Sequence, residues 1–173
     1  MCTSLGYQDS AGKAYFGRTL ELTMDLPLEV TFFPTGYETV SEVEGQPALT
    51  LTSRHAIAVT MPYRPPTPQA PLGFSDLKIL EGPNDKGLTF SLLSYPAAGG
   101  TQKSADVTRS VLSASDLGAW AVGQFETVAE VKTAFTVQPV MLQPLGLLGG
   151  AESPFHYVVH DATGLLHRQM GSA

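Results

Sequence analysis

Hydrophobic and polar residues alternate over short distances along most of the chain, which predicts a protein built mainly from β-strands and turns. Extended segments are expected at Cys2 to Tyr7, Ala14 to Arg18, Val30 to Phe33, Ala48 to Leu51 and Ala56 to Met61. The first two flank residues of turn composition and are expected to form a hairpin. Four prolines lie between Tyr63 and Gly73, so this segment is expected to be an exposed loop.

Strand patterns return in the second half of the chain. Residues 83–87 have the composition of a turn and precede a strand pattern over residues 88–95. Residues 155–160 predict another strand, which a turn at residues 161–164 closes. A return strand rich in β-branched or aromatic residues should follow, but residues 165–173 are largely polar. We therefore expect no convincing partner strand there and interpret the chain as truncated.

Two helices are predicted between these strands. Ser115 is expected to cap a helix that runs to about Gln124. Thr127 and Glu130 match a capping box, in which each side chain binds a backbone N–H of the first turn. The three- and four-residue spacing of the apolar residues after Thr127 places four of them on one face: Val128, Val131, Ala134 and Phe135.

Length and composition narrow the class of protein. The chain has 173 residues, of which 43% are hydrophobic, and this suits a single globular domain. A net charge of −6 with ten scattered Lys and Arg residues argues against a nucleic-acid partner. No apolar run reaches the roughly 18 residues of a membrane span, and no signal peptide is visible. We expect a cytoplasmic protein, or a periplasmic one if an upstream leader was lost.

The amino terminus carries the strongest chemical signal. Cys2 directly follows Met1, and methionine aminopeptidases remove Met before a small residue. Cys2 would then carry both a thiol and a free α-amino group, whose reference pKa of about 7.7–8.0 lets it act as a base at neutral pH. The alternative is that Cys2 is a small buried residue without chemistry. A single cysteine excludes an intramolecular disulfide and a CxxC zinc site.

Several segments together resemble the choloylglycine hydrolase family. This family contains conjugated bile acid hydrolases and penicillin V acylases, which are N-terminal-nucleophile (Ntn) hydrolases. The resemblance runs from residue 1 to residue 164 and is specific through the order and spacing of its parts. The segments that carry it are residues 1–4, the turn ending at Gly12, and residues 15–21, 33–37, 82–88, 117–131 and 156–164.

The resemblance implies a fold and a set of site residues. The fold would be α+β, the N-terminal portion of a four-layer αββα Ntn-hydrolase sandwich, and residues 1–173 would form one incomplete domain. Cys2 would be the nucleophile and its α-amino group the general base, with Arg18 beside the thiol to favour the thiolate. Glu21 lies where many members have aspartate, placed to bind the terminal amine. Ser94 lies where members specific for bile salts have an oxyanion-hole asparagine.

The function implied by the resemblance is hydrolysis of a linear carbon–nitrogen amide bond through a thioester. The candidate substrates are penicillin V, N-acyl-homoserine lactones and conjugated bile acids, with the first two ranked higher because of Glu21 and Ser94. No metal or organic cofactor is implied, the partner is a small-molecule amide, and a homo-oligomer is possible. The alternative is a catalytically inactive fragment of such an enzyme, stable only with a partner that supplies the missing half.

Two other polar features favour structural interpretations. His156 and His160 have the spacing of a metal pair on a helix, but the residues between them favour a strand. A packed or surface pair is therefore the better interpretation. Asn84 lies in the predicted turn, where its side chain is expected to bond the backbone of that turn.

Overall fold

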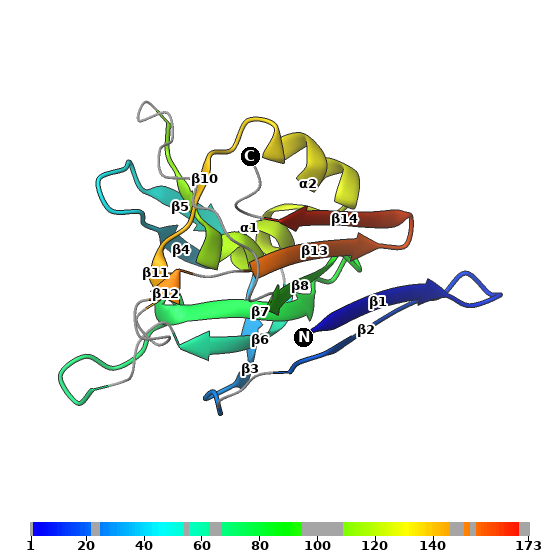
Figure 1. Cartoon of the computed structure of the whole chain (residues 1–173), viewed down its shortest axis with the longest axis horizontal. Helices are drawn as coiled ribbons and strands as arrows, with labels where there is room; N and C mark the ends of the chain where they lie inside the picture. Colours follow the sequence, from blue (N-terminus) through cyan, green and yellow to red (C-terminus); the bar gives the residue numbers. More distant parts are fainter. Residues whose placement is uncertain are drawn as a thin grey trace.

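A six-stranded antiparallel sheet is the centre of the fold (Figure 1). The computed structural model describes residues 2–21, 25–53, 56–62, 67–94, 109–145, 151–152 and 155–169. In spatial order the strands are β14 (Gly164–Gln169), β13 (Phe155–Asp161), β8 (Thr89–Ser94), β7 (Leu77–Pro83), β6 (Ala56–Pro62) and β3 (Glu29–Phe33).

Smaller elements surround this sheet. Strands β1 (Thr3–Gln8) and β2 (Ala14–Thr19) form a separate antiparallel hairpin, and β4 (Glu38–Ser41) and β5 (Leu49–Thr52) form another. The short pairs are β9 (Leu112–Ser113) with β10 (Val140–Met141), and β11 (Pro144–Leu145) with β12 (Ala151–Glu152). The helices are α1 (Leu117–Gln124) and α2 (Val128–Phe135), with 3₁₀ turns η1 (Phe74–Asp76) and η2 (Ala114–Asp116).

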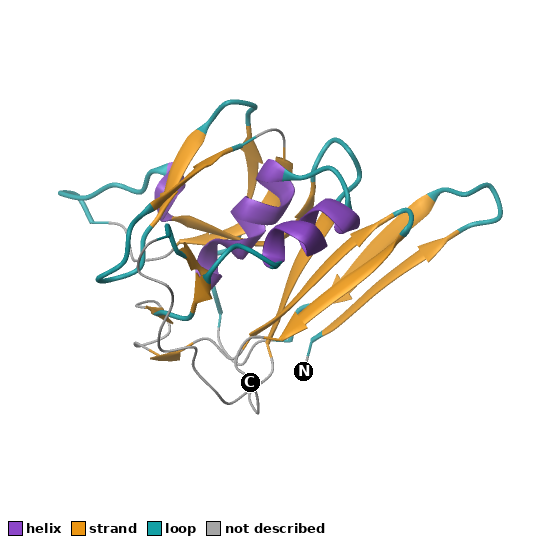
Figure 2. Ribbon diagram, turned by 90° about the horizontal axis from the view of Figure 1, so that it is seen from above, coloured by secondary structure: helices purple, strands orange, loops and turns teal. Residues whose placement is uncertain are grey.

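The two faces of the six-stranded sheet differ in polarity. Phe90 and Leu92 of β8 and Tyr157 and Val159 of β13 are buried in one core cluster with residues of α1 and α2. Burying each large apolar side chain contributes about 1.5–3 kcal/mol. The residues that alternate with them face the β1–β2 hairpin, which lies on the side of the sheet away from the helices (Figure 2).

Asn84 fixes the turn between β7 and β8 against helix α1. Its side chain is buried, and its Nδ2 donates to the carbonyl oxygens of Val122 at 3.0 Å and Phe125 at 2.7 Å. Its Oδ1 accepts from the backbone N–H groups of Lys86 and Leu88, each at 3.0 Å. The structural role expected for Asn84 is confirmed, and it extends beyond the turn to the carboxyl end of α1.

Asp161 fixes the turn between β13 and β14 against helix α2. Its Oδ2 accepts from Val128 N at 2.7 Å, and its Oδ1 accepts from the N–H groups of Thr163 at 2.7 Å and Gly164 at 2.9 Å. Burial raises the pKa of this carboxyl, but the hydrogen bonds outweigh burial, so the pKa lies below its ordinary value. The carboxylate therefore anchors the turn to the first turn of α2.

The capping box predicted for α2 is confirmed. Thr127 Oγ1 accepts from Glu130 N at 3.2 Å, and Glu130 Oε2 accepts from Thr127 N at 3.3 Å. The cap predicted at Ser115 was wrong, because Ser115 lies inside η2 and its hydroxyl bonds to Ser113 Oγ at 2.9 Å. The N-cap of α1 is Asp116, since a 3₁₀ turn precedes the helix there.

The expectation that no strand follows Gly164 was also wrong. Strand β14 pairs with β13 over six residues, from Asp161 opposite Gly164 to His156 opposite Gln169. It is the last strand on its side of the described sheet and pairs only with β13. Polar residues are tolerated in a strand at a sheet edge, and this is why composition gave the wrong result. In the proline-rich loop, residues 63–66 lie outside the described residues, and residues 67–70 are exposed as expected.

Replacing Asn84 with alanine is expected to lower the free energy of unfolding by roughly 2–4 kcal/mol, because two carbonyls and two N–H groups lose their partner in a buried place. Urea unfolding followed by circular dichroism measures this change. Asn84→Asp is the matched control, since it keeps the acceptor but loses the donor, and it should also destabilise the protein. A loss below about 0.5 kcal/mol for Asn84→Ala would contradict the anchoring role.

Candidate active site

The β1–β2 hairpin has an inner face toward the six-stranded sheet and an outer face away from it. On the inner side, Ser4 Oγ and His160 Nε2 share a hydrogen bond of 3.1 Å, and a Cβ placed at Gly6 would lie 3.1 Å from His160 Nδ1. On the outer side, Leu5 and Tyr7 are 53% and 57% exposed. Side chains alternate along a strand, so even-numbered residues of β1 face the sheet.

Cys2 and Arg18 lie on this inner face. Cys2 is only 8% exposed and lies two residues before Ser4, whose cross-strand partner is Arg18. Cys2 and Arg18 are therefore diagonal neighbours on one face, a separation that a long side chain spans. The strand register thus indicates one face of the hairpin for two residues that are sixteen positions apart in the sequence.

The guanidinium of Arg18 is buried between the hairpin and the sheet. Its side chain is 3% exposed, and its Nε lies 2.9 Å from Glu81 Oε2 on β7. Nε donates a hydrogen bond to the carbonyl oxygen of Thr19 at 3.3 Å. Glu81 Oε2 accepts no hydrogen bond among the described residues, so its contact with Nε is an ion pair only. Among the described residues, neither terminal nitrogen of Arg18 has a hydrogen-bond partner. Arg18 thus presents buried N–H donors that an anion or a carbonyl oxygen would satisfy.

The Glu21 carboxyl interacts with the terminal amino group of the 173-residue chain. A hydrogen bond with the terminal amino group and the positive charge of that group lower the pKa of the Glu21 carboxyl, and they outweigh partial desolvation. Glu21 is exposed to solvent. This amino group belongs to Met1, so the role expected for Glu21 toward the α-amino group of Cys2 stays a prediction.

Ser94 is the least defined of the four candidate residues. It ends strand β8, where its backbone is opposite Phe155 in β13. Its side chain lies outside the described residues. A role of its hydroxyl at an oxyanion stays a prediction.

Two further polar residues, one of them in contact with Arg18, were not assigned to the site from the sequence. Glu81 of β7 and Ser91 of β8 are cross-strand partners, and the Ser91 hydroxyl is buried without a hydrogen-bond partner among the described residues. The strand that carries Glu81 was not predicted, because residues 77–83 show no clean alternation. Only the adjacent turn motif at residues 82–88 pointed to this region.

His160 belongs to the contact between hairpin and sheet. Its ring lies 5.6 Å from the ring of Phe16, and it is buried. Burial lowers the pKa of His160, although the charge of Asp161 acts in the opposite direction. His156 and His160 lie on strand β13, as the sequence favoured. Within the described residues, no three His, Cys, Asp or Glu side chains are grouped to hold a metal ion.

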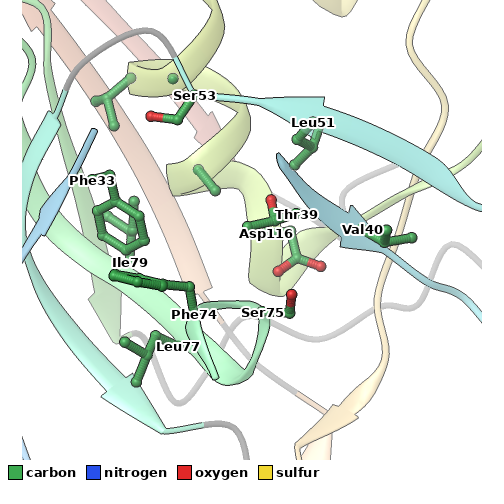
Figure 3. Close-up of a pocket in the computed structure, with 13 residues that line it drawn as sticks. Phe33, Thr39, Val40, Leu51, Ser53, Phe74, Ser75, Leu77, Ile79 and Asp116 are labelled. Carbon is green, nitrogen blue, oxygen red and sulfur yellow. The ribbon is translucent and has the colours of Figure 1, made fainter. Parts of the chain in front are cut away.

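A separate small pocket lies between the β4–β5 hairpin, α1 and β7 (Figure 3). Its volume of about 20 Å³ is close to that of one water molecule, and its lining residues include Phe33, Phe74 and Ile79. Asp116 at its edge pairs with Lys78 at 2.5 Å and accepts from Ser41 Oγ at 2.8 Å. These partners make Asp116 a structural carboxylate, and the pocket is too small for a substrate.

None of the described helices has the length and apolar character needed to cross a membrane.

Comparison with known proteins identifies the family of the chain. A family model described as "Linear amide C-N hydrolases, choloylglycine hydrolase family" matches residues 2–166. No curated protein sequence matches the chain significantly.

Solved structures show the same fold. The C2A mutant of conjugated bile acid hydrolase from Clostridium perfringens matches with a TM-score of 0.77 and 18% identity, over 99% of this chain and 49% of that chain. The R18L variant of the same Clostridium perfringens enzyme matches with a TM-score of 0.73 and 18% identity, over 99% of this chain and 48% of that chain. Penicillin V acylase from Agrobacterium tumefaciens matches with a TM-score of 0.74 and 16% identity, over 98% and 46%. The chain spans about half the length of these proteins, and the expected α+β Ntn-hydrolase fold is confirmed.

The protein is expected to lose stability as the pH falls from about 7 to about 5. The pKa of His160 is lower in the folded protein than its ordinary value near 6.5, so the unfolded chain binds the proton first and the stability present above pH 6.5 is lost on acidification. Urea unfolding at several pH values measures this dependence. His160→Gln should reduce the slope in this range, and an unchanged slope would contradict the contribution of His160.

Proposed function

The chain belongs to the choloylglycine hydrolase family of linear amide C–N hydrolases, and on this premise we propose that it hydrolyses a linear amide with Cys2 as the nucleophile. One observation carries the proposal. Cys2 is the first residue that the family model matches, and it lies buried on the same face of the β1–β2 hairpin as the buried guanidinium of Arg18. A cation beside a thiol favours the nucleophilic thiolate.

Removal of Met1 would give Cys2 the free α-amino group. This amine accepts the thiol proton, and the Glu21 carboxylate, which interacts with the Met1 amine in the uncleaved chain, orients the new amine one residue further on. The two Clostridium perfringens structures are of variants named C2A and R18L, which alter a cysteine and an arginine with the same numbers as Cys2 and Arg18 here. This coincidence supports the roles proposed for both residues.

The reaction proceeds in two stages. The thiolate attacks the amide carbonyl carbon and forms a tetrahedral oxyanion, which a donor at Ser94, its hydroxyl or its backbone N–H, stabilises. The C–N bond then breaks, the amine leaves with the proton held by the α-amino group, and a thioester remains. The α-amino group next deprotonates a water molecule, which attacks the thioester. The C–S bond breaks, and the acid and the Cys2 thiol are released.

Penicillin V and N-acyl-homoserine lactones are the preferred substrate candidates, ahead of conjugated bile acids. The ranking rests on Glu21, which stands where many family members have aspartate, and on Ser94, which stands where bile-salt-specific members have asparagine. The solved structures do not rank the substrates, because the conjugated bile acid hydrolase and the penicillin V acylase have TM-scores of 0.77 and 0.74.

A second proposal is that the chain acts only together with a partner polypeptide. The outer face of the hairpin favours it, because Leu5 and Tyr7 expose large apolar side chains there. The chain also spans about half the length of the solved structures that it matches. In this case the purified chain alone should be inactive.

The proposal predicts that the purified chain lacks Met1 and releases phenoxyacetate from penicillin V. Cys2→Ser should reduce the rate at least about a hundredfold, because a serine hydroxyl is a far weaker nucleophile at neutral pH. Intact-mass spectrometry establishes the amino terminus, and chromatography of the products measures hydrolysis of penicillin V, an N-acyl-homoserine lactone and a conjugated bile acid side by side.

Ser10→Ala is the matched control, since Ser10 lies in the turn at the opposite end of the same hairpin and should leave the rate unchanged. Retention of Met1, or equal rates of hydrolysis for wild type and Cys2→Ser, would contradict the assignment of Cys2 as the nucleophile. A chain that lacks Met1 and cleaves none of the three amides would favour the second proposal.

A further inference from the structure

Resting on the proposed function, we propose that Glu81 is a positioning residue for Cys2. Its carboxylate holds the Arg18 guanidinium between the hairpin and the sheet, so that the positive charge stays beside the sulfur. None of the residue roles expected from the family resemblance includes Glu81. The proposal rests on the ion pair, on an irregularity in strand β7 and on the donors that the ion pair leaves unused.

An irregularity in β7 turns Glu81 toward the hairpin. Thr60 is opposite Ile79, whereas the adjacent Val59 is opposite Glu81, so β7 contains one extra residue, Leu80, at this point. Residues two apart share a face in a regular strand. Here Ile79 lies against Gly118 of α1, while Glu81 contacts Arg18 on the other side of the sheet. The bulge therefore re-aims Glu81 toward the site.

The ion pair fixes Arg18 without using its terminal donors. Glu81 Oε2 and the carbonyl oxygen of Thr19 both approach Nε, at 2.9 Å and 3.3 Å. A bidentate pair would instead occupy a terminal nitrogen. In the part of the chain that the structure describes, both terminal nitrogens remain without a hydrogen-bond partner. They are thus left for a sulfur anion or a substrate oxygen.

Without Glu81, the buried guanidinium of Arg18 would be more stable if it moved toward solvent. Arginine side chains bury their methylene stem but extend the charged head toward water where they can. The Arg18 side chain is only 3% exposed, and the Ser91 hydroxyl beside Glu81 on the sheet contributes no hydrogen bond to it among the described residues. A lone buried charge is unfavourable unless an opposite charge compensates it. The Glu81 carboxylate supplies that charge.

The experiment measures the thiol pKa of Cys2 from the pH dependence of its alkylation by iodoacetamide, which is unambiguous because the chain has one cysteine. Loss of positioning in Glu81→Gln should raise the thiol pKa and slow alkylation at pH 7 about tenfold, as in Arg18→Leu. If the Glu81 carboxylate acts only through its own charge, Glu81→Gln should instead lower the thiol pKa, because removing a nearby negative charge favours the thiolate.

Glu81→Asp keeps the charge but shortens the side chain, so positioning predicts a smaller rise of the thiol pKa and a charge effect predicts none. In the Arg18→Leu background, Glu81→Gln should cause no further rise. Glu38→Gln, at an exposed strand position far from the site in sequence, is the control and should leave the thiol pKa unchanged.

A lowered or unchanged thiol pKa in Glu81→Gln overturns the proposal. If Glu81→Gln does not fold, an unchanged thiol pKa in Glu81→Asp overturns it. The measurement needs no turnover, so it gives an answer even for a chain that hydrolyses no amide. Failure of the proposed function is seen separately, through retention of Met1 or through hydrolysis that does not depend on Cys2.

Discussion

The buried guanidinium of Arg18 is the constraint on which the candidate site depends. Moving such a charge out of water is unfavourable by several kcal/mol unless opposite charge and hydrogen bonds compensate it. The Glu81 carboxylate compensates the charge from the six-stranded sheet, and the Thr19 carbonyl accepts one N–H from the hairpin. The inner face of the hairpin and the facing side of the sheet must therefore lie close together at this point and carry the charged pair there. Cys2 lies in the environment that results.

The helices on the far side of the sheet hold this polar face in place. Asn84 ties the β7–β8 turn to the end of α1, and Asp161 ties the β13–β14 turn to the start of α2. Glu81, Ser91 and His160 lie on the strands that these turns join. Because an antiparallel strand pair moves as a unit with its turn, the helix contacts fix the residues that face the hairpin. The apolar face thus sets the geometry of the polar face.

The parts that the sequence predicted are those encoded by neighbouring residues. The hairpin of β1 and β2, the capping box at Thr127 and the turn at Asn84 each depend on residues a few positions apart. Strand β14 was missed because its stability comes from pairing with β13, a contact that polar composition does not reveal. Glu81 was missed for a related reason. Its contact with Arg18 depends on a bulge in β7 and on a hairpin more than sixty residues away, and no local pattern encodes either.

The hairpin connects the stability of the fold to the chemistry of the site. A two-stranded hairpin alone is marginally stable in water, so β1 and β2 need contacts with the sheet. Those contacts include the hydrogen bonds of Ser4 with His160 and of Gln8 with the Ala162 carbonyl, and the ion pair of Arg18 with Glu81. The first two are ordinary polar contacts that many residue types would replace. The third holds a buried positive charge on the face of the hairpin that also carries Cys2, and among the described residues it leaves the terminal nitrogens of Arg18 without a hydrogen-bond partner. Arg18 therefore gives up hydrogen bonds in the folded state that an acceptor bound beside its terminal nitrogens would restore.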